Sequence, residues 1–126
     1  MAGFSDYAEN EILDHALGGL TWAAPGASWI QLHTADPTDT GTTAVANNAT
    51  RKQVSWAAAS AGQVSSDADL DWTTGEVTTT EVYSHYSLWD ASTAGNCIGT
   101  GTVSGGSVTA GNAFKIPSGD LDFSLD

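Results

Sequence analysis

Four short runs rich in β-branched and aromatic residues fill the last third of the chain, and no other feature constrains the fold as strongly. The runs cover residues 82–90, 97–103, 113–117 and 121–126. The Gly, Asn, Asp and Ser residues between them are typical of the turns that join antiparallel strands. In the final run Leu121, Phe123 and Leu125 alternate with polar residues, which is the period of a strand with one buried face. We therefore expect antiparallel strands here, the last of them reaching Asp126.

The rest of the chain is consistent with one mainly β domain. Its 126 residues are enough to bury a core without disulfides, so we expect a single domain over residues 1–126. We expect a short N-terminal α-helix over residues 4–18 and an antiparallel β-sandwich of about seven or eight strands over residues 28–126. The side chains expected in the core are Ile30, Leu32, Val54, Trp56, Leu70, Tyr86, Leu88, Phe114, Ile116, Leu121, Phe123 and Leu125.

The predicted helix has a clear start, an apolar stripe and a clear end. Ser5 is a favourable N-cap, and glycines at 18–19 end the helix. The stripe consists of Ala8, Ile12, Leu13, Ala16 and Leu17. We expect Tyr7, Ile12 and Leu13 to contact another protein, because a lone amphipathic helix beside a sandwich has an apolar face to cover.

Two strands are predicted on either side of a long polar loop. Ile30 and Leu32 share the inward face of a strand over residues 28–34, and His33 lies on the opposite face, where we expect it to be half-exposed. A second strand is predicted over residues 51–57. The loop of residues 35–50 between them has no periodicity, and loops of that length are often interaction surfaces. Its turn signal at Asp36 and Pro37 makes these two residues candidate contacts.

The charge balance excludes one large class of partner. Fifteen carboxylates stand against three basic residues, for a formal net charge of −12. Binding to nucleic acid requires cations that displace counterions from phosphates, so we expect no nucleic-acid partner. The N-terminus lacks a secretory signal and no apolar run approaches the roughly 20 residues of a membrane span, so we expect a soluble protein without a membrane partner.

Three alternating acids suggest a weak calcium site. Asp67, Asp69 and Asp71 have the spacing that opens a calcium-binding loop. Trp72 stands where that loop needs glycine, and Thr78 stands where it needs a bidentate glutamate. The favoured interpretation is a solvated acidic strand face, which would also discourage aggregation at a sheet edge.

The sequence contains no arrangement typical of catalysis. His15, His33 and His85 lack metal-ligand spacing, and no nucleophile motif or phosphate loop is present. The single cysteine, Cys97, is expected to be a small buried apolar residue. We therefore predict a protein without enzymatic activity and without a cofactor.

The tryptophans and tyrosines of the late strands suggest a surface role. On the predicted alternation, Val82, Tyr86 and Leu88 point inward, so Tyr83 and Trp89 would be exposed on the opposite face. Exposed aromatic residues on a sheet indicate either a subunit contact or a platform for sugars. A carbohydrate-binding β-sandwich module, using Trp72 with these two residues, is accordingly one hypothesis.

Five segments in a fixed order carry a further resemblance. They are residues 4–15, 32–39, 51–56, 85–91 and 119–126. In this order the chain resembles a family of small virion structural proteins of tailed bacteriophages, over nearly its whole length. No single motif is chemically diagnostic, and the order and spacing carry the likeness. One departure is the polar strand of residues 83–87, where similar sequences are often more apolar.

The resemblance implies a non-enzymatic structural protein of a phage virion, of the kind labelled tail fibre, minor tail or head decoration protein. Fibres are typically long, repetitive or coiled, and this chain has neither repeats nor heptads. We therefore expect a capsid decoration or cement protein bound in many copies to the head exterior, with a tail fibre or minor tail protein as the alternative. The expected partners are the major capsid protein or tail proteins and further copies of the chain, after synthesis in the host cytoplasm.

Overall fold

The computed structural model of the protein describes residues 3–125, so the predicted strand end at Asp126 lies outside the described residues. Between these bounds the chain forms one helix and nine strands. They are β1 (Gly3–Phe4), α1 (Asp6–Ala16), β2 (Ser28–His33), β3 (Lys52–Val54), β4 (Gln63–Ser65), β5 (Leu70–Trp72), β6 (Glu81–Trp89), β7 (Cys97–Val108), β8 (Phe114–Ile116) and β9 (Asp122–Ser124). The predicted mainly β fold with one N-terminal helix is confirmed.

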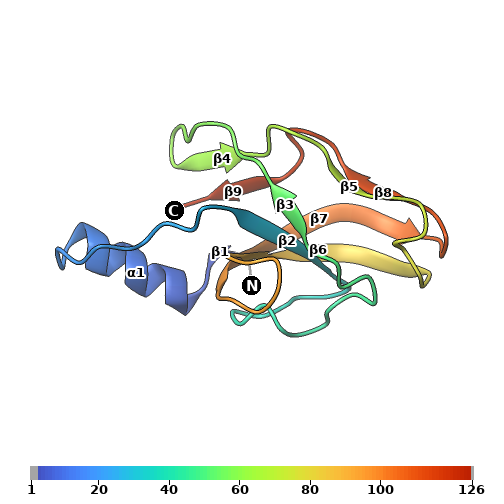
Figure 1. Cartoon of the computed structure of the whole chain (residues 1–126), viewed down its shortest axis with the longest axis horizontal. Coiled ribbons are helices and arrows are strands. Elements are labelled where there is room, and N and C mark those ends of the chain that lie inside the picture. Colours follow the sequence, from blue (N-terminus) through green and yellow to red (C-terminus); the bar gives the residue numbers. More distant parts are fainter. Residues whose placement is uncertain (1–2, 126) are drawn as a thin grey trace.

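The strands build a large sheet faced by two short strand pairs, in the manner of a β-sandwich. The large sheet has the order β1-β7-β6-β2-β3, and the pairs are β4-β9 and β5-β8. Every pairing is antiparallel. Figure 1 shows both short pairs on the same side of the large sheet, with α1 projecting from one end.

The core lies between the large sheet and the short pairs. Ile30, Leu32, Trp72 and Leu121 are completely buried there. Covering one Leu or Ile side chain is worth about 1.5–3 kcal/mol, so the alternating strands account for much of the stability. Most of the predicted core is confirmed, but Trp56 and Phe114 are only partly buried. Leu125 is exposed, because it lies beyond the end of β9.

Glycines in β7 let aromatic rings of the core pack directly on its backbone. A Cβ atom at Gly101 would lie 2.5 Å from the ring of Tyr86, and one at Gly99 would lie 2.5 Å from the ring of Phe123. Real Cβ atoms do not approach other atoms so closely, so neither position accepts a side chain unless the ring moves. The packing of the aromatic rings on β7 therefore requires glycine at both positions.

The alternation predicted for the late strands was wrong in part, because β6 contains an irregularity. Its pairing with β7 shifts register between Tyr83 and His85, and such a bulge reverses which residues face inward. Tyr83 therefore shares the core side with Tyr86 and is fully buried, with its ring centroid 5.0 Å from that of Phe114. Val82, predicted to point inward, is 49% exposed.

The second face of the large sheet is also covered. Residues 34–50 fold back over it, with a bridge between His33 and Val45. His33, predicted to be half-exposed, is completely buried, and Trp89, predicted to be exposed, is nearly so. A Cβ atom at Gly41 of this segment would lie 3.1 Å from the Trp89 ring, which shows how closely the segment approaches the sheet.

The helix begins and ends inside its predicted bounds of 4–18. Gly3 and Phe4 pair with β7 as a short edge strand, so the helix starts only after the Ser5 N-cap. At its other end, the Leu20 N–H donates to the Asp14 carbonyl, and Gly19 has a left-handed φ of 71°. A glycine in this conformation reverses the chain after a helix. No helix within residues 3–125 is long and apolar enough to cross a membrane.

Candidate assembly interface

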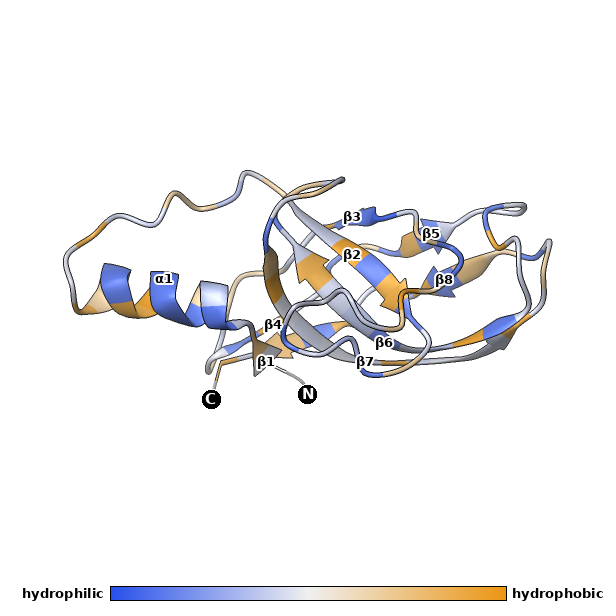
Figure 2. Cartoon of the chain, turned by 90° about the horizontal axis from the view of Figure 1, so that it is seen from below, coloured by the Kyte–Doolittle hydropathy of each residue, from blue (hydrophilic) through white to orange (hydrophobic). Residues whose placement is uncertain are grey.

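Residues 6–22, here called the helical arm, extend from one end of the sandwich (Figures 1 and 2), with Ala8 and Trp22 packed against the core. Leu13, Leu17 and Leu20 are 55%, 82% and 61% exposed. The other large apolar side chains that are strongly exposed in residues 3–125 are scattered over different elements: Val45, Val82 and Leu125. Exposed apolar side chains that lie close together mark surfaces for other molecules. The helical arm is thus the leading candidate for a contact with another protein.

The arm is fixed to the sandwich at its first turn. The Ser5 hydroxyl accepts a hydrogen bond from the Ala8 N–H and donates to the carbonyls of Cys97 and Ile98 in β7. Ala8 is completely buried. A helix of 11 residues is marginal in water on its own, so this anchor supplies both its stability and its direction.

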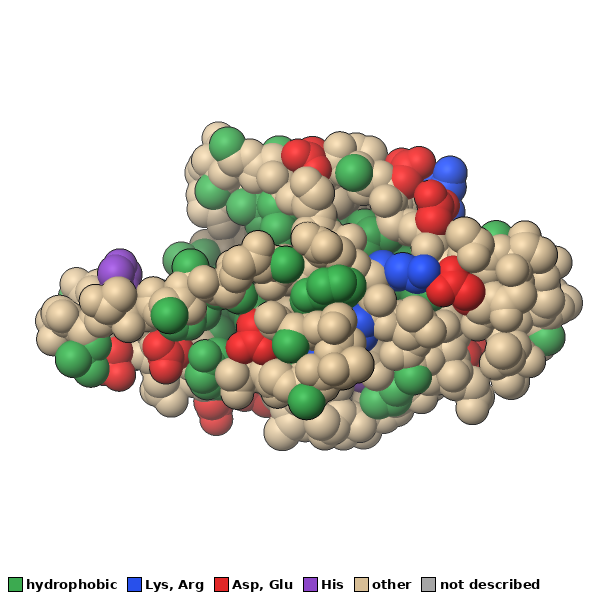
Figure 3. Space-filling view, viewed as in Figure 1, with side chains coloured by type: hydrophobic (Ala, Val, Ile, Leu, Met, Phe, Trp, Pro, Cys, Tyr) green, Lys and Arg blue, Asp and Glu red, His purple; other side chains and the backbone are tan. Residues whose placement is uncertain are grey.

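Acidic side chains accompany the apolar ones on the arm. The arm carries Asp6, Glu9, Glu11 and Asp14. Asp6 and Glu9 lie in the first turn, where the helix dipole favours negative charge. Figure 3 shows acidic and apolar side chains next to each other on the projecting end. Of the predicted contacts here, Leu13 is exposed, while Tyr7 and Ile12 are half-buried.

The polar segment of residues 34–50 is packed against the sheet and does not stand free. Pro37 is buried, and only Asp36 of this predicted pair reaches the surface. The Asp36 carboxylate accepts a hydrogen bond of 2.9 Å from the Thr38 N–H, which fixes the turn. A contact role for Asp36 and Pro37 stays a prediction, and Pro37 would need a rearrangement to make one.

A serine–histidine pair lies under this segment. His33 Nε2 is 2.7 Å from Ser87 Oγ, and His33 Nδ1 is 2.8 Å from the Thr43 carbonyl oxygen. Burial lowers the pKa of His33, against the opposing effect of its backbone hydrogen bonds. This arrangement has the distances of an activated nucleophile. However, both side chains are completely buried, and Ser87 also accepts a hydrogen bond from the Trp89 indole, so the pair joins the segment to the sheet.

The cysteine near this pair has no reactive character either. Cys97 is buried, as predicted, and its burial raises the pKa of the thiol to about 11. A thiol with so high a pKa is almost entirely protonated at neutral pH, and the thiolate is the nucleophilic form. The residue acts as a small apolar side chain of β7.

The acidic residues proposed for calcium are partly engaged in other contacts. Lys115 Nζ lies 3.3 Å from an oxygen of Asp69 and 3.6 Å from one of Asp71. Two hydrogen bonds to the Asp69 carboxylate lower its pKa. The larger effect comes from the Ser118 N–H and the smaller from the Lys115 side chain. Asp67 lies outside the short strand β5, so the predicted strand over all three acids is too long. Among residues 3–125, no three His, Cys, Asp or Glu side chains are arranged to hold a metal ion.

The aromatic residues proposed as a sugar platform are inside the protein. Trp72 and Tyr83 are completely buried and Trp89 is 7% exposed. The Arg51 guanidinium covers Trp89, with its central carbon 3.9 Å from the ring centroid. These side chains therefore cannot form a flat exposed row for stacking against sugars, and the prediction that Tyr83 and Trp89 are exposed was wrong.

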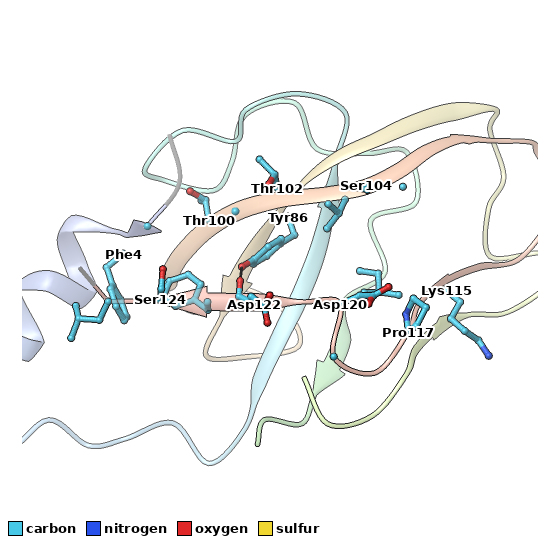
Figure 4. A pocket seen from close by; sticks show the side chains of 18 of the residues that line it. Phe4, Tyr86, Thr100, Thr102, Ser104, Lys115, Pro117, Asp120, Asp122 and Ser124 are labelled. Atoms are coloured by element: carbon cyan, nitrogen blue, oxygen red, sulfur yellow. Dashed lines mark hydrogen bonds between the residues drawn. The ribbon is translucent and has the colours of Figure 1, made fainter. Parts of the chain in front are cut away.

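A groove opens along β7, on the side of this strand away from β6. It has a volume of about 840 Å³ and lies between β7 and the chain from β8 to β9. Figure 4 shows Thr100, Thr102 and Ser104 along one side and Asp120 and Asp122 along the other. Tyr86 forms part of the floor, and its hydroxyl donates to the Asp122 carbonyl. No pattern in the sequence predicted this groove.

The chain matches one known protein family over most of its length. Residues 3–124 match the family described as podophage GP4 fiber I protein gp80. The chain belongs to this family. A search of curated proteins gave no match. Because gp80 is a virion protein family of tailed phages, the predicted resemblance is confirmed.

Membership in the gp80 family supports a structural role in the virion, in association with other virion proteins. A structural family of this kind is in general not enzymatic, in line with the buried position of the serine–histidine pair. The gp80 fold also explains why sequence patterns missed that pair, since His33 and Ser87 are 54 positions apart and meet only because β2 and β6 are neighbours.

Proposed function

We propose that this chain is a fibre component of the phage tail and that the helical arm joins it to its neighbours in the particle. The family description, which names a fibre protein, is the observation that favours the tail over the head. On this proposal the chain has no catalytic task. The sandwich is a rigid body, and the arm is the part that reaches out.

The geometry of the arm suits such a joint. An 11-residue helix extends about 16 Å, which carries Leu13 and Leu17 clear of the sandwich. Covering the exposed part of each leucine is worth about 1–2 kcal/mol. Three such side chains fall short of the roughly 8 kcal/mol of a micromolar complex, once the entropy of association is included. A single arm contact is therefore weak, and it becomes durable when many copies bind together.

The occupant that we propose for the arm is a different virion protein next to it in the particle. The acidic residues of the arm lie beside the leucines, so they can stay in water while the leucines are covered. Predicted contact residues Tyr7 and Ile12 lie at the base and middle of the same helix, and they would be the border of that contact.

Location and copy number in the particle test this proposal. Purified virions would be separated into heads and tails, and the chain would be quantified in each fraction by mass spectrometry with labelled peptides. The major capsid protein and the tail tube protein serve as internal controls for cross-contamination. We expect a small number of copies per particle, confined to the tail fraction. Hundreds of copies in the head fraction would refute the fibre assignment and support capsid decoration.

A further inference from the structure

The outer edge of β7 is an open strand edge. β1 pairs with β7 only at Gly99 and Thr100. The following residues, Gly101 to Gly105, line the groove, and no strand within residues 3–125 pairs with them on that side. Gly101 is buried, so the edge presents backbone N–H and C=O groups over residues 102–105, or about 13 Å.

The open edge has one of the features that usually protect a sheet edge, a register irregularity in which residues 103–105 of β7 face only Ser84 of β6. It lacks two others, charge and proline. Natural edge strands carry charged residues, proline or a covering element that prevents pairing with other chains. Residues 101–105 read Gly-Thr-Val-Ser-Gly, with no charge and no proline. An added strand would lie along the same edge as β1.

The groove beside the edge determines the chemistry of a guest. Partly buried Val103 and Phe114, with the Tyr86 ring between them and β9, can receive apolar side chains. Glu9, Asp120 and Asp122 also line the groove and are exposed, so they can meet cations. Lys115 is the basic residue in the lining, and it is already paired with Asp69 and Asp71.

A second copy of the chain is a poor guest for this groove. Two chains that each carry a net charge of −12 repel each other, most strongly where acids face acids. The chain also has few cations to offer. Arg51 donates to the carbonyls of Ala91 and Ala94, and Lys52 is paired with Glu76 at 2.7 Å.

We propose that the groove binds an extended segment of a different polypeptide, with alternating apolar and basic residues, which adds a strand to the outer edge of β7. The backbone of the guest pairs with residues 102–105, its apolar side chains enter the groove, and its Lys or Arg side chains meet Glu9, Asp120 and Asp122. Strand addition of this kind combines backbone hydrogen bonds with side-chain pockets. The proposal does not depend on whether the chain belongs to the tail or to the head.

Binding of a synthetic peptide tests the proposal. The probe is an eight-residue peptide of alternating valine and lysine, with a fluorescent label, and its anisotropy is measured against the full chain. We expect saturable binding that weakens as salt rises, because the charge contacts are on the rim. The same peptide with glutamate in place of lysine should not bind. If the lysine peptide does not bind at a millimolar concentration of the protein, the proposal is overturned.

Matched protein variants locate the site. E9Q together with D120N removes two rim charges, and we expect about fivefold weaker binding. D14N together with D67N removes two charges outside the groove and should leave the affinity within about twofold. An equal loss in both pairs would show attraction to the overall charge alone and would overturn the proposal.

Backbone pairing needs its own readout. Methylation of alternate peptide nitrogens removes the donors that face β7 and should weaken binding about tenfold. Hydrogen exchange should slow at the amides of residues 102–105 when the unmethylated peptide binds. Unchanged exchange there, or equal affinity of the methylated peptide, would overturn strand addition. Slow exchange at these amides that depends on chain concentration without peptide would show pairing between copies and would overturn a different polypeptide as guest.

Discussion

Substituting Gly101 by alanine tests the packing of β7 against the core. A Cβ atom there would lie 2.5–2.6 Å from three atoms of Tyr86, so the ring must move. Forcing one carbon into a packed core costs about 1–3 kcal/mol. A displaced Tyr86 also loses its 3.0 Å hydrogen bond to the Asp122 carbonyl, worth about 1–2 kcal/mol. Alanine also lowers the conformational entropy of the unfolded chain, which offsets about 0.4–1 kcal/mol of the lost stability. We expect a net loss of about 1–5 kcal/mol, with a central value of about 3 kcal/mol.

Urea unfolding followed by tryptophan fluorescence measures this loss. With a slope of about 2 kcal/mol per molar urea, a loss of about 3 kcal/mol lowers the midpoint by about 1.5 M. Gly26→Ala is the matched control, because a Cβ at Gly26 meets no atom within 4 Å and its φ is not left-handed. A Gly101→Ala protein as stable as the Gly26→Ala protein would refute the reasoning. The double variant with Tyr86→Leu should lose less than the sum of the single changes, since the smaller side chain leaves room for the methyl group.

Two further predictions concern the arm and the buried histidine. Leu13→Gln with Leu17→Gln should leave the folding stability nearly unchanged but reduce incorporation into particles at least tenfold, whereas Val45→Gln with Val82→Gln, at exposed positions elsewhere, should incorporate normally. Equal incorporation of both pairs, measured by mass spectrometry of virions, would remove the arm from the interface. Because burial lowers the pKa of His33, the unfolded chain takes up a proton there at a pH at which the folded chain does not. The free energy of unfolding should therefore fall as the pH drops below about 6.5, and the fall between pH 7 and 5 should be shallower in His33→Gln. An equal dependence of the free energy of unfolding on pH in both proteins would contradict a lowered pKa of His33 in the folded chain.

Sequence patterns predict the buried residues correctly where the local alternation of apolar side chains agrees with their burial in the folded protein. Ile30 and Leu32, or Leu121 and Phe123, occur at spacings that only a strand with one buried face explains, and each is buried. The helix is also predicted from local signals, namely the Ser5 N-cap and the glycines after Leu17. Its start was misplaced because Gly3 and Phe4 pair with β7, a partner almost 100 residues away.

The errors arise from features that no local pattern encodes. Tyr83 is on the core side at an irregularity where residues 103–105 of β7 face only Ser84 of β6, and alternation within one strand cannot reveal such a register shift. The covering of Trp89 and His33 depends on a polar segment that folds back, although its composition is typical of an open loop. The groove depends on where β7 lacks a neighbour, and strand order is a property of the whole chain.

The positions of the three cations have a consequence for proteolysis. Enzymes that cut after Lys or Arg can attack this chain only at Arg51, Lys52 and Lys115. Lys52 and Lys115 lie within paired strands, and the Arg51 side chain is held by the carbonyls of the neighbouring loop. Such enzymes need an extended, mobile segment, and the helical arm, which projects furthest, contains neither residue type. The most accessible part of the protein is therefore a part that trypsin-like proteases cannot cut.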